Sequence, residues 1–356
     1  MFNIIAPKND ENYALFEHYL TKSFSFAVTG LTTLLRLLLI QKIHKITEKK
    51  VLVITATEQN ALKYQNDLKK AFGVNADLIP FQNISMYESV SPNRYDYAEQ
   101  VRVLTEKPEV VIAPVKALLE KFPTQKFYEE NSVTVKVGDE IDLKKLIQQF
   151  VDLGYKRSTM VSDIGEFSVR GDIIDFFSLD KNAVRIELWG DEIVDIRYFN
   201  NESQKSIEKI KSAKIMPMYK FTLKNGVPDE IKKEDEEGYF EGIEVYQNYF
   251  NTDLATILDY FKDYIIVLDE TSELYSKYEF VDKNFEEQLQ ENLKLGLNVD
   301  LKGRNHIPFE DFIQKSAGFV KVGLNNFIDS EMDDIIEFNS QPVQNFGAKL
   351  DDIAGY

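Results

Sequence analysis

The stretch FSFAVTGLTTLLRLLLIQKIH (residues 24–44) decides the fold class. A short apolar run enters a turn at Gly30, and an almost entirely apolar segment follows it. This pattern is typical of a buried strand that leads into a buried helix. VLVITAT (51–57) and EVVIAP (109–114) repeat it, each with a helical pattern behind it. We therefore expect an α/β unit whose parallel sheet is covered on both faces.

The helix after the second strand has recognisable ends. Thr57 can accept a hydrogen bond from the first turn as an N-cap, and Gly73 can end the helix in a left-handed conformation. Between them, Leu62, Leu68 and Phe72 are spaced to lie on one apolar face. The sequence predicts that this face packs on the sheet.

The pattern changes near residue 122. SVTVKVG (132–138) alternates with period two, a helix is expected over 143–153, and GEFSVRGDIIDFF (165–177) follows. The run 184–199 predicts a hairpin whose turn is Gly190 and Asp191. These features indicate a small α+β domain of mainly antiparallel strands, ending near Ile210.

Parallel-sheet character then returns in LATILDYFKDYIIVLDE (254–270). The charged run at 232–242 predicts a solvated helix end or loop. From residue 329 onward the sequence is polar and acidic, which predicts a linker or the truncated edge of a domain. The expected domains are residues 1–121, residues 122–210, residues 211–328, which complete the first domain, and residues 329–356, which form the linker.

Composition excludes several classes of protein. The chain has 356 residues, no Cys and a formal charge of −17. There can be no disulfide, Cys-ligated zinc, thiolate nucleophile or iron–sulfur cluster. His18, His44 and His306 are isolated in the sequence, so no metal site is expected. No signal peptide or membrane span is recognisable, so the expected location is the cytoplasm and no membrane partner is expected.

The turn AVTGLTTLL (27–35) lies where a phosphate loop would lie between strand and helix. Such a loop, G-x-x-x-x-G-K-[ST], needs glycines, a lysine for phosphate charge and a hydroxyl for magnesium. Here Gly30 remains, but Ala27 and Thr32 replace the two motif glycines. Thr33 replaces the lysine and Leu34 the hydroxyl. We therefore expect a degenerate loop without nucleotide hydrolysis, and no catalytic residue.

Asp269 and Glu270 end the strand YIIVLDE. Such a pair at a strand's carboxyl end can hold magnesium and activate water in motor ATPases. The alternative is a strand capped by two solvated acids. Without a working phosphate loop, we favour the alternative and expect no bound cofactor in this region.

A third candidate site is LGYKRSTMVSDIGEFSVRGDIIDFF (153–177), where cations surround a predicted strand pair. The cations are Lys156, Arg157 and Arg170, and the nearby acids are Asp163, Glu166 and Asp172. One interpretation is surface salt bridges among these residues. The other is a docking patch for a protein partner, because interfaces are enriched in arginine.

Taken in order, these segments resemble the N-terminal region of bacterial transcription-repair coupling factors, which itself resembles the excision-repair protein UvrB. The resemblance also rests on AEQVRVL (98–104), VVIAPVKALLEKFP (110–123), RIELWGDEIVDIRYF (185–199) with SQKSIE (203–208), and ILDYF leading to VLDE. The degenerate loop favours the coupling factors over UvrB. So does the stretch 80–97, which leaves no room for UvrB's tyrosine-rich hairpin.

The resemblance implies a RecA-like, degenerate P-loop domain split into parts 1a and 1b, with domain 2 inserted between them. It implies that domain 2 binds UvrA, which makes Arg170, Arg157 and Lys156 the leading docking candidates, with Glu166 and Asp172 beside them. Ser168 stands where UvrB tends to carry a further arginine. It also implies motor domains that use ATP and magnesium and contact RNA polymerase and DNA outside these residues, and a C-terminal region that masks domain 2.

The favoured function is therefore a non-catalytic adaptor that brings UvrA to stalled RNA polymerase. One rival is a UvrB-like ATP-dependent helicase that recognises damage. Another is a DNA-binding module, which the net charge of −17 disfavours because such binding depends on clustered Lys and Arg.

Overall fold

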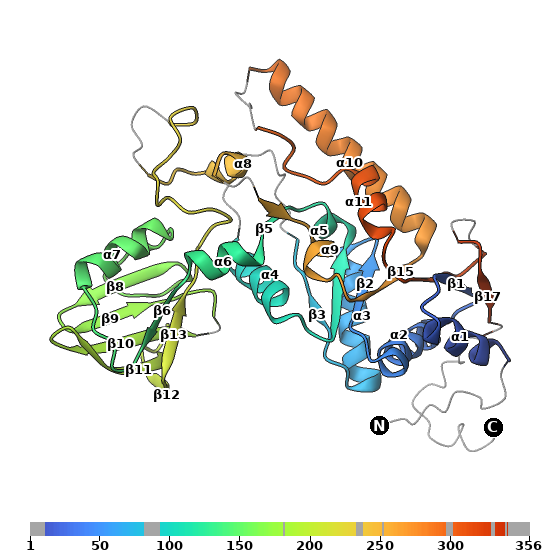
Figure 1. The fold of residues 1–356 in the computed structure, drawn as a ribbon, viewed down its shortest axis with the longest axis horizontal. Coiled ribbons are helices and arrows are strands. Elements are labelled where there is room, and N and C mark those ends of the chain that lie inside the picture. Colours follow the sequence, from blue (N-terminus) through green and yellow to red (C-terminus); the bar gives the residue numbers. More distant parts are fainter. Residues whose placement is uncertain are drawn as a thin grey trace.

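The computed structural model describes residues 11–81, 93–180, 182–232, 238–250, 253–296, 302–328, 332–338 and 340. Within them, a larger part is built on a parallel sheet and a smaller part mainly on antiparallel strands (Figure 1). The smaller part comes from the middle of the sequence and lies beside the larger part (Figure 1). The predicted fold class, an α/β unit with an inserted α+β unit, is confirmed.

In the described part of the chain, the larger part contains a seven-stranded sheet of order β17-β1-β16-β15-β2-β4-β3, with every pairing parallel. The strands are β1 (Phe26–Thr29), β2 (Val51–Thr55), β3 (Asp77–Leu78), β4 (Val110–Pro114), β15 (Ile265–Asp269), β16 (Lys321–Leu324) and β17 (Ile335–Glu337). Strands β1, β2, β4 and β15 are buried along their whole length, as expected of a sheet covered on both faces.

Successive side chains of β2 enter two different hydrophobic cores. Leu52 and Ile54 join a core that includes residues of α4, α5, α9, α10 and α11, whereas Val51 and Val53 join one that includes α1, α2 and α3. These helices are α1 (Glu11–Thr21), α2 (Thr33–Thr47), α3 (Glu58–Phe72), α4 (Arg94–Glu106), α5 (Val115–Leu118), α9 (Ile257–Tyr260), α10 (Thr271–Lys294) and α11 (Phe309–Ser316).

Helix α3 begins and ends where the sequence predicts. Thr57 Oγ1 accepts a hydrogen bond from the Asn60 backbone N–H, and Gly73 closes the helix at φ 67°. The predicted buried face is wrong at Leu62, which is 47% exposed. Ala61, Tyr64 and Leu68 are buried instead. The adjacent side of the helix faces the sheet, because there Tyr64 can donate a hydrogen bond to Asp269.

The smaller part is a sheet of order β12-β11-β10-β9-β8-β7 with α7 packed on one face. Its pairs are antiparallel except for β7 with β8. The elements are α7 (Leu143–Asp152), β7 (Lys156–Arg157), β8 (Glu166–Arg170), β9 (Ile173–Phe176), β10 (Ala183–Trp189), β11 (Glu192–Phe199) and β12 (Ser206–Ile210). The predicted hairpin of β10 and β11 is confirmed.

The smaller part continues beyond the predicted boundary at Ile210. Strand β13 (Ser212–Ile215) pairs antiparallel with β6 (Val133–Lys136), and Phe221, Phe240 and Ile243 join the core under α7. The segment 211–328 therefore does not return to the larger part at its start. The return begins at Val245, which joins the core of the larger part, and continues with β14 (Leu254–Ala255), which pairs with β5 (Phe122–Pro123). The remaining elements are α6 (Gln125–Asn131), η1 (Ile243–Tyr246) and α8 (Gln247–Phe250).

The expected linker over 329–356 needs a similar correction. Residues 335–337 form β17, which pairs with β1 at the edge of the parallel sheet. Ile336 is 1% exposed, so even this acidic stretch supplies a core side chain. Residues 329–331, 339 and 341–356 of that prediction lie outside the described residues, as do 233–237 of the charged run and 82–92 of the stretch that the hairpin argument used.

Candidate functional site

The outer face of the six-stranded sheet, turned away from α7, carries polar side chains. On the inner face, Phe150 of α7 stacks on Phe167 with ring centroids 4.8 Å apart. On the outer face, strand register sets residues of five strands side by side. We define the polar face as Ser168, Arg170, Asp175, Arg185, Glu187, Asp195, Arg197 and Lys209.

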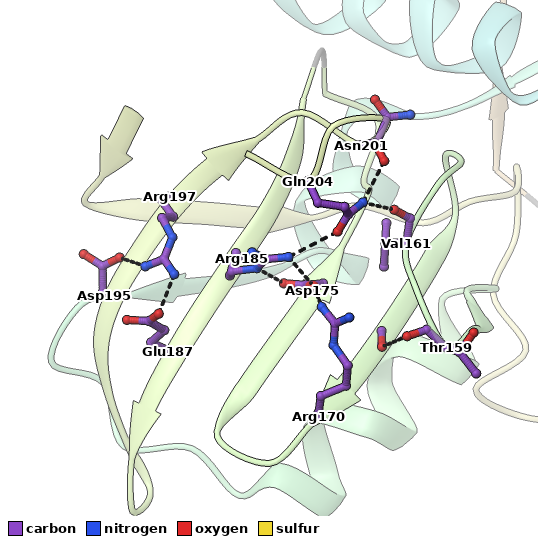
Figure 2. A network of polar contacts seen from close by, with 11 residues as sticks. Thr159, Val161, Arg170, Asp175, Arg185, Glu187, Asp195, Arg197, Asn201 and Gln204 are labelled. Carbon is purple, nitrogen blue, oxygen red and sulfur yellow. Dashed lines mark hydrogen bonds and ion pairs between the residues drawn. The ribbon is translucent and has the colours of Figure 1, made fainter. Parts of the chain in front are cut away.

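Asp175 is the buried centre of the polar face, with a side chain 1% exposed. Arg170 donates from Nη2 to Asp175 Oδ2 at 2.5 Å. Arg185 donates from Nε to Oδ1 at 2.7 Å and from Nη2 to Oδ2 at 2.9 Å, a bidentate pair (Figure 2). The Arg185 guanidinium also lies 4.6 Å from the centroid of the Phe199 ring. One carboxylate therefore orients two arginines.

Arg197 organises the neighbouring charges of the same face. It donates to Glu187 and, at 2.5 Å, to Asp195, and Lys209 Nζ lies 2.6 Å from the other Asp195 oxygen. The hydrogen bond from Arg197 lowers the pKa of Glu187, and the bonds from Lys209 and Arg197 lower the pKa of Asp195. Both carboxylates stay ionised at neutral pH, so the face presents alternating fixed charges.

The predicted cations occupy different surroundings. Arg170 belongs to the polar face and is 45% exposed, so it can contact a partner while it remains paired with Asp175. Lys156 and Arg157 form the edge strand β7 and are exposed. Neither makes an ion pair with another described residue.

The predicted acids do not pair with these cations. Glu166 Oε2 accepts from the backbone N–H groups of Ser162 at 2.9 Å and Asp163 at 3.1 Å, so it holds the preceding turn. Asp172 is exposed in the turn between β8 and β9. Among the described residues, the interpretation as surface salt bridges to Asp163, Glu166 and Asp172 is therefore wrong. Arg170 pairs instead with Asp175, because strand pairing brings that buried carboxylate beside it.

Sequence reasoning missed Asp175, Arg185 and Trp189. The alternation in VRIELW was the available signal, because it sends Arg185, Glu187 and Trp189 to the same side of β10. Trp189 is 81% exposed at the end of that strand. A large aromatic side chain left this open beside fixed charges marks a surface suited to protein contact.

A second site lies at the carboxyl ends of β1 and β15. Gly30, Thr32 and Thr33 line one cavity of about 690 Å³ together with Asp269 and Glu270. The fold thus brings the degenerate loop and the strand-end acids together. Leu34, the fourth loop candidate, lies in the first turn of α2 and is not part of this lining.

Arg36 of α2 ties the cavity wall together. Its guanidinium pairs with Asp269 at 2.5 Å, with Glu270, and with Asn326 Oδ1 at 2.8 Å. Tyr64 donates to Asp269 at 2.6 Å. Burial raises the pKa of Asp269, while these donors act in the opposite direction. The favoured interpretation of two solvated acids is wrong for Asp269, which is 5% exposed, because Arg36 and Tyr64 compensate its burial.

Two of the groups that could meet a phosphate in this cavity, Thr32 and Arg36, are already bonded within the chain. The Thr32 backbone N–H donates to Ser340 Oγ at 2.8 Å, and Thr32 Oγ1 caps α2. The buried cation, Arg36, has two carboxylate partners. The buried charge of the wall is therefore compensated, while Lys63 lines the same cavity and is exposed.

The comparisons with known proteins agree with the motif resemblance. Residues 133–221 match the family described as the UvrB interaction domain. Over 364 residues, the chain is 27% identical to the transcription-repair-coupling factor of Staphylococcus aureus (strain MRSA252), covering 91% of this chain and 31% of that protein. The corresponding protein of Staphylococcus haemolyticus (strain JCSC1435) is 25% identical with the same coverage. The chain thus spans 31% of the length of these relatives, and the UvrB-interaction match contains the whole polar face.

None of the described helices combines the length and the apolar character that crossing a membrane requires.

Proposed function

We propose that the chain is a UvrB-like adaptor module of a transcription-repair coupling factor. In this proposal it recruits UvrA to stalled RNA polymerase in the cytoplasm during transcription-coupled nucleotide excision repair, and it hydrolyses no ATP itself. The observation that carries the proposal is the Arg170, Asp175 and Arg185 cluster, which is fixed on an open sheet face within the UvrB-interaction match. Contacts with RNA polymerase and DNA, ATP-driven translocation and masking of the polar face by a C-terminal region belong to the complete protein.

The polar face suits a protein partner because its charges are already held in place. Arg170 and Arg185 share Asp175, so little side-chain entropy is lost when a partner's acidic group meets them. Trp189 adds an apolar surface that a partner could cover. Discrete charges around an aromatic anchor favour specific recognition over attraction by net charge, which is −17 for the chain.

Binding to purified UvrA tests the adaptor role. We expect Trp189→Ala and Arg170→Glu each to weaken the affinity measured by calorimetry by about 30-fold or more, the effect of losing one interface hot spot. Arg157→Glu tests the edge strand in the same assay. Lys144→Glu is the matched control, because Lys144 is exposed on α7, which covers the opposite face of the sheet. Unchanged affinity in all three test variants, with unchanged thermal melts, would contradict the proposal.

The absence of hydrolysis is tested separately from docking. The Arg36 pairs support it, because the buried cation of the cavity wall is engaged by Asp269 and Glu270 and no lysine stands at position 33. We expect no shift of the thermal transition with millimolar Mg-ATP and no phosphate release. A UvrB-like helicase should show both a thermal shift with Mg-ATP and the release of phosphate. A DNA-binding module predicts a gel shift that strengthens as salt falls.

A further inference from the structure

A buried histidine and two carboxylates meet between α10 and the segment that precedes α11. His306 Nε2 lies 2.9 Å from Asp282 Oδ1 and 3.4 Å from Glu286 Oε1. The three donor atoms all lie within 4.8 Å of one another. The His306 side chain is 0% exposed, and those of Asp282 and Glu286 are 19% and 31% exposed. From the sequence His306 is expected to be isolated, but the fold gives it two anionic neighbours.

The carboxylates are positioned by helix geometry. Asp282 and Glu286 are four residues apart on α10, so their side chains stand on one face about one turn apart. One carboxylate oxygen of Asp282, Oδ2, accepts a hydrogen bond from the Phe309 backbone N–H at 2.9 Å. Its other oxygen, Oδ1, is the one turned towards His306.

The histidine is positioned from both sides along the chain. Asn305 donates to the Val245 carbonyl at 2.7 Å and accepts from Asn248 at 3.0 Å. The Ile307 backbone N–H donates to the Leu119 carbonyl at 2.9 Å. His306 itself forms a β-bridge with Glu120. The ring is therefore presented by a fixed backbone, as a preorganised ligand would be.

The donor atoms, and the two separations measured from His306, suit a tetrahedral divalent ion. Zinc binds imidazole nitrogen and carboxylate oxygen at about 2.0–2.2 Å, which places the ligand atoms of a tetrahedron roughly 3.3–3.5 Å apart. The two distances from His306 Nε2, 2.9 and 3.4 Å, are close to this spacing. Glu286 Oε1 is also buried. Arg304 lies close to it, but no described residue donates a hydrogen bond to it.

Arg304 is the competitor for this oxygen. Its Nε lies 2.5 Å from Glu286 Oε1, but the Arg304 side chain is 52% exposed and can turn into solvent. A zinc ion would replace that ion pair and neutralise both carboxylates at once, which an arginine shared with a single carboxylate does not do.

We propose that His306, Asp282 and Glu286 form a zinc site that fastens α10 to the segment leading into α11, with water as the fourth ligand. The site goes beyond the adaptor role and uses none of the residues of the polar face. It would add to the stability of the larger part, because binding energy at a site assembled only by folding is folding energy.

Metal binding to the full 356-residue chain tests the site. We expect one Zn²⁺ per chain by calorimetry, a rise in the melting temperature with Zn²⁺, and a visible absorption band typical of tetrahedral Co²⁺. His306→Gln and Asp282→Asn should each weaken Zn²⁺ binding by at least about 100-fold. Loss of a residue that only orients a ligand costs about 10- to 100-fold, and loss of a ligand should cost at least as much. Glu287→Gln is the control, because Glu287 is exposed on the same helix and pairs with Lys283.

Arg304→Gln separates the zinc site from a plain ion-pair cluster. This variant keeps all three ligands and removes their competitor, so a zinc site should bind Zn²⁺ more tightly and its melting temperature with Zn²⁺ should match or exceed that of the wild type. An ion-pair cluster should only lose stability. The absence of Zn²⁺ heat and of a Co²⁺ band in both the wild type and Arg304→Gln would overturn the proposal.

Discussion

Asp175 pairs with two guanidinium groups through one buried carboxylate, so its charge is difficult to replace. Asp175→Asn keeps the shape of the side chain but leaves Arg185, whose side chain is 14% exposed, facing an amide. We expect the free energy of unfolding, measured in urea, to fall by ~3 kcal/mol, the lower end of the cost of breaking a buried ion pair. Arg170→Ala should cost less than ~1 kcal/mol because Arg170 is partly exposed and Asp175 keeps Arg185. Equal losses in the two variants would contradict this account.

Glu244 makes stability depend on pH. Burial is the main cause that raises its pKa from 4.5 to about 7, although Tyr239 donates to its Oε1 at 2.7 Å. Its Oε2 is buried and accepts no hydrogen bond from the described residues. The folded state therefore holds the proton more tightly than the unfolded state.

The sign of the pH effect follows from that difference. The contribution of Glu244 to stability is fully present below pH 4.5 and is lost as pH rises through about 7, by up to ~3 kcal/mol. Glu244→Gln cannot ionise, so its free energy of unfolding relative to the wild type should increase between pH 5 and pH 8. Parallel pH profiles for the two proteins, measured by urea unfolding, would show that the Glu244 carboxyl ionises equally easily in both states.

Among the secondary-structure elements, β17 depends on the loop after β1. Gly30 has φ 70°, and a Cβ built on it would lie 1.8 Å from the Phe338 carbonyl oxygen, directly after β17. Gly30→Ala should therefore push β17 away from β1 and destabilise the protein by ~1–3 kcal/mol, the usual range for a strained backbone position. Hydrogen exchange should show faster exchange in residues 335–338, with little change in β4 on the far side of the sheet. Gly73→Ala is the control, since a Cβ there meets nothing within 4 Å although its φ is similar.

For the whole molecule, the extent of the smaller part can be tested with fragments. A fragment of residues 124–250 keeps β13, Phe221 and Phe240, which pair or pack with the rest of that core. A fragment of residues 124–210 lacks them and leaves β6 without its strand partner. We expect a cooperative thermal transition by circular dichroism for the longer fragment only. Similar cooperative melts for both would favour the boundary at Ile210 that the sequence predicts.

Features that depend on neighbouring residues in the chain could be predicted from the sequence, whereas features that depend on a contact with a distant residue could not. The buried strands β2, β4 and β15 and the hairpin of β10 and β11 were predictable, because apolar runs, alternation and turn residues are local signals. Tyr64 was not, because a helical pattern alone does not show which strip meets a polar partner on another strand.

The candidate sites show the same division. The departures from the phosphate-loop motif at Thr33 and Leu34 could be read from the sequence directly. The role of Arg36 could not, because its partner Asp269 is 233 residues away and the surrounding helix predicts only burial. From the sequence, Asp175 is one polar residue in a strand; the register places it opposite Arg185 on β10 and Ser168 on β8, with Arg170 diagonally across. Asp269, Glu270 and Arg170 could thus be located from the sequence, but not the partners with which they pair.

The strand order of the parallel sheet constrains how the chain can fold during synthesis. β1 and β2 are close in sequence but are separated in the sheet by β15 and β16, so β1 has no strand partner until residues 321–324 or 335–337 have emerged. The smaller part can form its own strand pairs while the larger sheet still consists of β2, β4 and β3 only. On the ribosome, the smaller part would therefore fold first, while the incomplete parallel sheet keeps exposed hydrophobic edges to which chaperones can bind.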